Sequence, residues 1–258
     1  MPVATTDDGV SISWEAQGEG PPLVLLHGVT EDSLLWKSIA DELSERFRVI
    51  LVDLRGHGRS GEATDYSPLV MTGDVAAVVR AADVEAPSVV GHSLGGLVAT
   101  AYASEHDVHA VVNVDLSLDT RPIAARIRML ETNLRGPSYV PTLRSMFAML
   151  AGDRLPQETR AAIDDYAARA PREVVLGVYD ILLRTPDDEL LRMNEEMLDK
   201  IRAPYLLLHS VNPGPEYLSW LTSHLPSATV EVWPNSGHFL HLLDPERFVQ
   251  RVVDFLAA

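Results

Sequence analysis

Short apolar runs alternate along most of the chain with longer segments whose apolar residues recur every three or four positions. Residues 9–17 instead alternate apolar and polar positions, which is typical of an antiparallel edge strand. The runs resemble parallel strands buried on both faces: Leu23–Leu26, Val49–Val52, Val89–Val90, Val108–Val114, Tyr205–Leu208 and Thr229–Val232. The intervening segments predict helices over Asp32–Arg46, Leu69–Ala82, Leu94–Glu105, Glu216–His224 and Pro245–Leu256. This order predicts an α/β fold with a doubly wound, mostly parallel sheet.

The alternation stops between about Leu116 and Asp199, where the pattern is helical and contains no strand. We therefore expect a helical cap at residues 117–199, inserted between two strands of a core formed by residues 1–116 and 200–258. The cap is expected to cover the C-terminal edge of the sheet. Its predicted helices are Ile123–Leu134, Thr142–Leu150, Gln157–Arg169, Val174–Leu183 and Glu189–Lys200.

Composition excludes several kinds of site and partner. The 258 residues are 46% hydrophobic, which suffices for one large core with a modest insertion, and they include no cysteine for disulfides or thiolate metal sites. The formal net charge of −16 argues against nucleic acid and anionic membranes as partners. With no signal peptide or membrane span visible, we expect a cytoplasmic protein that acts on a small molecule. A homodimer is compatible with these observations.

A serine boxed by glycines follows one of the apolar runs, in Val89-Val90-Gly91-His92-Ser93-Leu94-Gly95. Gly-x-Ser-x-Gly between a buried strand and a helix predicts a tight turn that lifts the serine hydroxyl out of the sheet. Such a turn also points the N-terminus of the following helix at whatever the serine attacks. The motif nominates Ser93 as a nucleophile, which then needs a base and an oxyanion site.

Two further segments supply candidates for those roles. His27-Gly28-Val29 directly follows a strand, so the backbone N–H groups of Val29 and Leu94 could converge into an oxyanion hole. His238 lies in a loop between the last strand and the final helix, where an imidazole could take the serine proton and return it to the leaving group. His241 is a nearby competitor, but Gly237 favours His238 because a glycine suits a loop that bends into a cleft.

Taken together, these motifs resemble the α/β-hydrolase superfamily over the whole chain outside the cap. The resembling segments are His27-Gly28, Asp53-Leu54-Arg55-Gly56-His57-Gly58-Arg59-Ser60, Gly91–Gly95 and Gly237-His238, in the chain order serine, acid, histidine. The resemblance implies a triad hydrolase of the esterase or lactonase type. It also implies that Asp53 and the loop of Arg55–Ser60 are mainly structural.

The acid of the triad departs from the family pattern. The resemblance places it after the Tyr205–Leu208 strand, where Asn212 and Pro213 carry no charge. Asp115, at the end of the neighbouring strand, is our preferred replacement, because some family members supply their acid from that position and a carboxylate there could orient His238. Glu216 is the alternative, although it is expected to begin a helix. Asn212, or no acid at all, remains a third interpretation.

A serine nucleophile forms an acyl-enzyme, so the expected substrate is a carbonyl compound, and no metal or organic cofactor is expected. Five of the seven methionines lie in the cap, which suits an adaptable apolar pocket. We therefore predict hydrolysis of a carboxylic ester or lactone of a small to medium hydrophobic substrate. The predicted substrate contacts are His92, Met129, Met146, Met149, Tyr179 and Phe239.

Three alternatives stay open at this stage. Thioester or C–C bond hydrolysis could use the same triad. A non-catalytic binding protein of the same fold would explain the missing acid after the Tyr205–Leu208 strand. Finally, Arg121, Arg126 and Arg128 at the cap entrance could bind a substrate carboxylate.

Overall fold

An eight-stranded sheet forms the centre of the computed structural model, which describes residues 2–257. The strands lie in the order β1-β2-β4-β3-β5-β6-β7-β8. The pairs β1–β2 and β2–β4 are antiparallel, and the other described pairs are parallel. Their bounds are β1 Val3–Thr5, β2 Ser11–Gln17, β3 Pro22–Leu26, β4 Arg48–Val52, β5 Ser88–His92, β6 Val111–Val114, β7 Tyr205–His209 and β8 Ala228–Val232.

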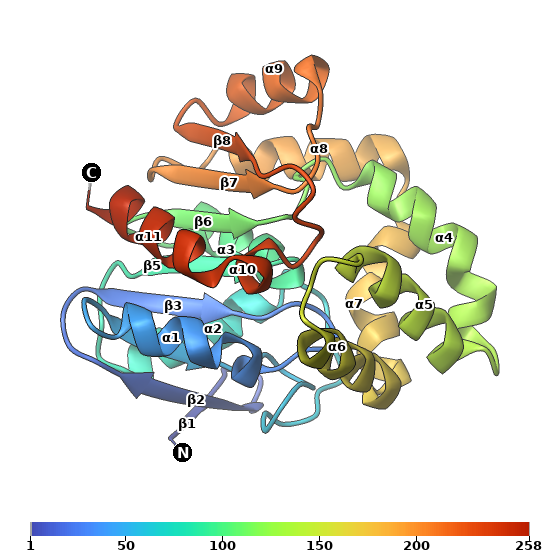
Figure 1. The fold of residues 1–258 in the computed structure, drawn as a ribbon, viewed down its shortest axis with the longest axis horizontal. Coiled ribbons are helices and arrows are strands. Elements are labelled where there is room, and N and C mark those ends of the chain that lie inside the picture. Colours follow the sequence, from blue (N-terminus) through green and yellow to red (C-terminus); the bar gives the residue numbers. More distant parts are fainter. Residues whose placement is uncertain (1, 258) are drawn as a thin grey trace.

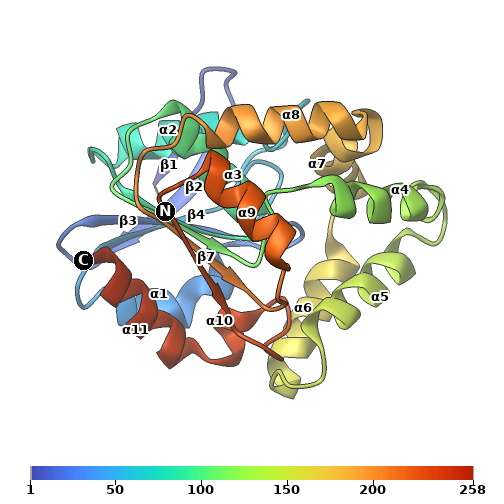
Figure 2. The same ribbon diagram turned by 90° about the horizontal axis from the view of Figure 1, so that it is seen from above.

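Helices cover both faces of this sheet (Figures 1 and 2). One face carries α1 (Lys37–Leu43), α10 (Leu240–Leu243) and α11 (Pro245–Leu256), and the other carries α2 (Met71–Ala81), α3 (Leu94–Glu105) and α9 (Pro215–His224). Successive strand residues point to opposite faces, so Leu23 and Leu25 pack with one layer and Val24 and Leu26 with the other. Because both layers are apolar, each strand reads as a continuous apolar run.

Five consecutive helices are inserted between β6 and β7: α4 Arg121–Arg135, α5 Tyr139–Ala151, α6 Gln157–Arg169, α7 Arg172–Arg184 and α8 Asp187–Leu198. Helices α4–α7 lie beyond the carboxyl ends of the parallel strands, whereas α8 runs back along the core and packs on α3 (Figures 1 and 2). No helix within residues 2–257 is long and apolar enough to cross a bilayer.

The predicted fold class is confirmed, and the differences are local. The short strand β1 was not predicted; it pairs with β2, so β2 is antiparallel as expected but does not form the edge of the sheet. The helix predicted over Asp32–Arg46 is shorter, because Asp32 caps a 3-10 turn at Ser33–Trp36 and α1 then ends at Leu43. The strand predicted over Val108–Val114 begins only at Val111.

The turn between β5 and α3 requires backbones to approach more closely than side chains permit. A Cβ on Gly91 would lie 2.0 Å from the carbonyl oxygen of Gly95, and one on Gly95 would lie 2.4 Å from that of Leu26. These neighbours are backbone atoms held by the sheet and the helix. The two glycines therefore allow α3 to begin directly against the end of β3.

We expect Gly95→Ala to destabilise the fold by about 1–3 kcal/mol, because the added methyl cannot be accommodated without moving β3 or α3. Gly73→Ala is the matched control, since Gly73 lies in α2 with nothing within 4 Å of its added Cβ. Alanine there should stabilise by about 0.5–1 kcal/mol. Urea unfolding of both variants measures the difference, and an unchanged midpoint for Gly95→Ala would contradict this explanation of the turn.

Candidate active site

Ser93 lies at the junction of β5 and α3, in a backbone conformation that few residues adopt. Its φ of 52° and ψ of −116° place it outside the ordinary regions, and it precedes the first residue of α3. The backbone N–H of Ser93 donates to the carbonyl of Val114 at 3.0 Å, which continues the ladder between β5 and β6. The backbone of Ser93 is thus hydrogen-bonded to the sheet, and the chain leaves the sheet at this residue to begin α3.

His238 reaches the same place from the loop after β8. Its Nδ1 lies 2.8 Å from Oδ2 of Asp115, and its backbone N–H donates to the carbonyl of Leu150, at the end of α5, at 3.0 Å. Gly237 has a φ of 69°, and a Cβ there would lie 3.0 Å from the carbonyl oxygen of Ala151. The glycine therefore lets the histidine loop pass close against the helical insertion.

Asp115 occupies the first position after β6, with a φ of 58°. Its backbone N–H donates to the carbonyl of Leu208 at 2.8 Å, and its carboxylate accepts from the N–H of Ser210 at 2.5 Å and from the Ser210 hydroxyl at 2.9 Å. Burial alone would raise the pKa of this carboxyl, but His238 and the two bonds from Ser210 outweigh burial and hold the pKa below its usual range. Asp115 therefore faces His238 as a carboxylate.

The other candidates for the acid, and the histidine that competes with His238, have different surroundings. Glu216 is exposed in the first turn of α9, where a carboxylate suits a helix N-terminus. The side chain of Asn212 accepts from the N–H of Gly214. His241, the competing imidazole, is buried against Trp36 with its ring centroid 4.6 Å away, and burial lowers its pKa well below the usual range. The structure brings Asp115 to His238 and leaves these three aside.

The two residues whose backbone N–H groups are proposed for the oxyanion hole line the cavity that contains Ser93. Leu94 is the first residue of α3, where a backbone N–H has no partner within the helix. Val29 lies in the turn after β3 and, like Leu94, lines the same cavity as Ser93. A Cβ on Gly28 would lie 2.6 Å from Oε1 of Glu31, so a glycine leaves room for that carboxylate in the turn.

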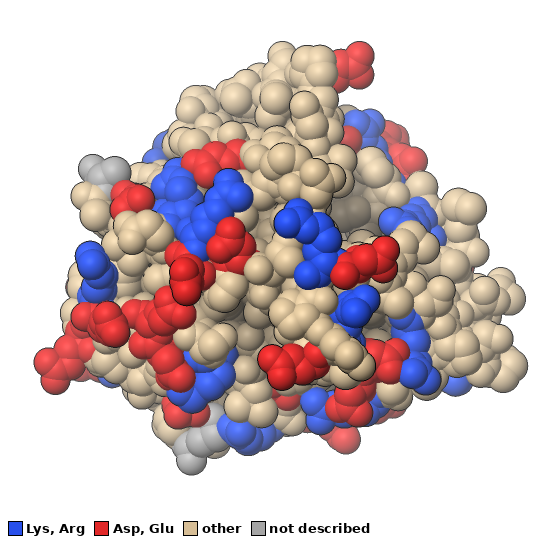
Figure 3. All heavy atoms as spheres, viewed as in Figure 1, with Lys and Arg blue, Asp and Glu red and all other residues tan. Residues whose placement is uncertain are grey.

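A cavity of about 420 Å³ joins the candidate catalytic residues to the insertion. On the face seen in Figure 1, the surface is hollowed beside the insertion, among scattered acidic and basic groups (Figure 3). Ser93, Asp115 and His238 line one end of the cavity. The remainder is predominantly aliphatic and is lined by residues that include Leu97, Leu116, Ile123, Ile127, Met146, Leu150, Val178, Tyr179, Ile181, Leu182 and Val211.

Of the predicted substrate contacts, Met146 and Tyr179 line this cavity. The other four predicted contacts lie elsewhere. Met129 and Met149 lie on outward helix faces, 84% and 63% exposed, because helical spacing alone did not show which face looks inward. His92 and Phe239 are fully buried behind the site, where their ring centroids lie 5.0 Å apart. These four are absent from the cavity lining within the described part of the chain.

The loop after β4 has internal partners, in line with the structural role implied by the family resemblance. The Asp53 carboxylate accepts from the backbone N–H groups of Ser33 at 2.8 Å and Arg59 at 3.0 Å. The buried guanidinium of Arg55 pairs with Asp74 at 2.6 Å. These bonds fix the loop beside the turn that contains Val29.

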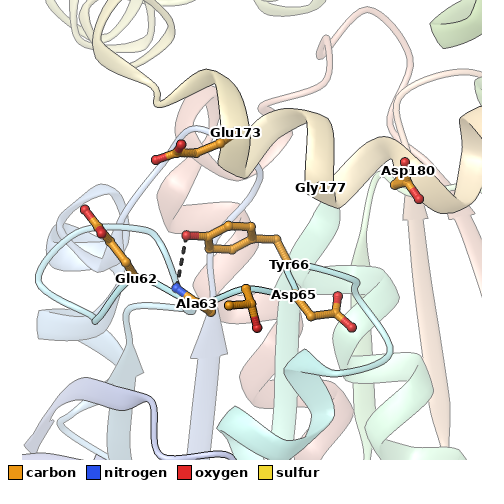
Figure 4. A pocket seen from close by; sticks show the side chains of 8 residues that line it. Glu62, Ala63, Asp65, Tyr66, Glu173, Gly177 and Asp180 are labelled. Carbon is orange, nitrogen blue, oxygen red and sulfur yellow. Dashed lines mark hydrogen bonds between the residues drawn. The ribbon is translucent and has the colours of Figure 1, made fainter.

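A second hollow, where α7 passes the loop at residues 62–66, lacks the groups for the same chemistry. No histidine lines it, and the described residues contain no cluster of side chains suited to hold a metal ion. The hydroxyl of Tyr66 accepts from the N–H of Ala63 at 3.0 Å. Figure 4 shows four carboxylates around it that point in different directions: Glu62, Asp65, Glu173 and Asp180.

Sequence reasoning missed three groups that the structure places at the site. Ser210 holds Asp115 through two hydrogen bonds. His209 lines the cavity with its Nδ1 3.9 Å from Oδ1 of Asp115. Glu31 is buried beside the turn after β3. His209 ends β7 and Ser210 follows it, so their position at the end of a strand next to β6 was the available signal.

Comparison with known proteins agrees with this geometry. A model of the alpha/beta hydrolase family matches residues 23–251. The chain is 32% identical to the pimeloyl-[acyl-carrier protein] methyl ester esterase of Edwardsiella ictaluri, over 95% of this chain and 97% of the relative. The structure resembles the esterase RhEst1 from Rhodococcus sp. ECU1013, with a TM-score of 0.78, 26% identity and coverage of 100% and 98% of the two chains.

A further solved structure shows the same fold at lower sequence similarity. The enol-lactonase from Burkholderia xenovorans LB400 has a TM-score of 0.78 and 20% identity, with all of both chains covered. The sheet order, the helical insertion between β6 and β7, and the matched family model therefore lead to one conclusion. The chain belongs to the alpha/beta hydrolase family.

Proposed function

We propose that this hydrolase cleaves a carboxylic ester or lactone of a small to medium hydrophobic substrate through an acyl-enzyme on Ser93. The observation that carries the proposal is one cavity lined by Ser93, His238 and Asp115, in which Nδ1 of His238 lies 2.8 Å from the Asp115 carboxylate. An imidazole oriented by a carboxylate presents its other nitrogen as a base.

The reaction proceeds in two halves. The Ser93 hydroxyl attacks the substrate carbonyl while His238 takes its proton, and the oxyanion accepts from the N–H groups of Val29 and Leu94. His238 then protonates the leaving alkoxide, and the C–O bond breaks. A water molecule, deprotonated by His238, then attacks the acyl-enzyme. The bond between the acyl carbon and Oγ of Ser93 breaks, His238 returns its proton to Oγ, and the acid is released. Asp115 stays ionised and stabilises the imidazolium in both halves.

The aliphatic lining supports a hydrophobic substrate. Side chains of α4, α5 and α7 face the serine across the cavity, among them Ile127, Met146 and Val178. Burying an apolar group there contributes about 25 cal/mol per Å². The relatives described as esterases support ester cleavage in particular.

Arg126 favours a second candidate substrate, an ester that carries a carboxylate. It is the one lysine or arginine that lines the cavity in the described chain, and it is exposed beside Met149. Arg121 and Arg128 do not compete for this role, since their guanidinium groups pair with Asp119 and Asp187.

The first test is intact-mass analysis after treatment with a fluorophosphonate, which reports an activated serine whatever the natural substrate. We expect one adduct on the wild type and none on Ser93→Ala. An unlabelled wild type that binds hydrophobic esters unchanged would favour the non-catalytic binding protein. Rapid thioester cleavage with only trace ester cleavage would favour the thioester alternative.

Asp115→Asn should lower kcat by about 10⁴-fold with KM little changed, because the amide favours the wrong tautomer of His238. Glu216→Gln is the matched control and should keep wild-type kinetics, since Glu216 lies outside the cavity lining. Steady-state kinetics on an aryl ester measures both variants. A near-normal kcat in Asp115→Asn would exclude Asp115 as the acid of the triad.

Arg126→Ala separates the two substrate candidates. For a hydrophobic substrate we expect kcat/KM on a neutral ester to change less than about 2-fold, because an exposed arginine contributes little to an uncharged ligand. The comparison substrate is the matched half-ester with a free carboxylate, and Arg126→Lys tests charge alone. A half-ester preference in the wild type that disappears in Arg126→Ala would replace the hydrophobic substrate by the second candidate.

A further inference from the structure

A buried carboxylate lies between the two segments that would serve Ser93. Glu31 is 4% exposed, and its Oε2 accepts from the backbone N–H of Gly28 at 2.7 Å. Gly28 directly precedes Val29, the proposed oxyanion donor. The space that a side chain on Gly28 would fill is taken by the Glu31 carboxylate, since a Cβ there would lie 2.6 Å from Oε1. The shape of this turn therefore depends on Glu31.

The same carboxylate contacts His92, which is fully buried directly before Ser93. Nδ1 of His92 lies 3.3 Å from Oε2 of Glu31, within hydrogen-bond distance of the oxygen that also accepts from Gly28. Nε2 of His92 lies 3.1 Å from the backbone carbonyl oxygen of His238. One imidazole thus connects the turn after β3 with the loop that carries His238.

Hydrogen-bond chemistry fixes the protons of this connection. A carbonyl oxygen only accepts, so Nε2 of His92 must carry the proton of its bond to His238. With Nε2 protonated, the hydrogen bond between Nδ1 and Oε2 of Glu31 needs one further proton, carried by one of these two atoms. Burial alone would raise the pKa of Glu31, but the charge and hydrogen bond of His92 and the Gly28 amide outweigh it and lower the pKa.

We propose that Glu31 and His92 are positioning residues that set the turn of Val29 and the backbone of His238 relative to each other. Neither side chain lines the cavity, so neither contacts the substrate. Through Gly28 the pair fixes the direction of the Val29 amide, and through the His238 carbonyl it fixes the base. The inference rests on the proposed hydrolysis at Ser93. A displacement of about 1 Å in such groups costs on the order of 10²-fold in rate.

The experiment measures the rate constant of fluorophosphonate labelling, together with kcat and KM on a neutral ester. The kcat is calculated per enzyme molecule that can be labelled. Glu31→Leu removes both bonds and should slow labelling and kcat about 10²-fold with KM little changed. Glu31→Gln should recover most of this rate, because its carbonyl can accept from Gly28 and its amide can donate to Nδ1 of His92. A merely structural loss would lower the amount of folded enzyme without changing the rate per site.

His241→Phe is the control for packing. The His241 ring lies 4.5 Å from that of His92, centroid to centroid, but none of the three hydrogen bonds of the connection involves it. We expect this variant to label within about 3-fold of the wild-type rate, since ring volume is largely kept. Should Glu31→Leu not fold, His92→Phe removes both imidazole bonds and carries the same expectation.

The possible outcomes distinguish a failure of the positioning role from a failure of the proposed function. A wild type that is not labelled would overturn the proposed function and the positioning role with it. A labelled wild type with an unchanged rate in Glu31→Leu, or in His92→Phe, would overturn the positioning role alone. A loss in Glu31→Gln as large as in Glu31→Leu would also overturn it, because charge rather than hydrogen-bond geometry would then be responsible.

Discussion

The hydrogen-bond ladder of β5, β6 and β7 continues one residue beyond the strands, and the proposed chemistry depends on that continuation. The N–H of Ser93 bonds to Val114, and the N–H of Asp115 bonds to Leu208, so serine and acid are registered against each other by backbone. Both residues then leave the sheet with positive φ. Parallel strands place their carboxyl ends at one edge, which is where α/β proteins bind ligands.

Local motifs predicted those parts of the site whose geometry is set locally. Glycines around Ser93 and before His238 follow from close backbone approach, and Asp115 could be nominated because the strand before it was expected beside β5 and β7. The sequence pattern did not show which helix faces of the insertion point toward the cavity. Met129 and Met149 have helical spacing, yet both face solvent. The strand β1 is three residues long, too short for a periodicity to indicate it.

Glu31 shows why part of the site could not be predicted. In the sequence it stands between a threonine and an aspartate, a setting typical of a solvated turn. Its buried partner His92 is far away along the chain and reaches it only because β3 and β5 are neighbours. A charged residue that is stabilised by a long-range partner leaves no local signal, whereas Gly28, beside which it packs, is visible in the sequence just after a strand.

The bond from the His238 amide to the Leu150 carbonyl ties the insertion to the loop that carries the proposed base. Exchange of caps between related scaffolds is thus constrained at one helix end. In a transplanted insertion whose α5 ended one turn earlier, the Leu150 carbonyl would no longer accept from the His238 N–H. This would hold even if every core residue were kept. Under the proposed function, the lining of the cavity and the orientation of His238 therefore both depend on α5.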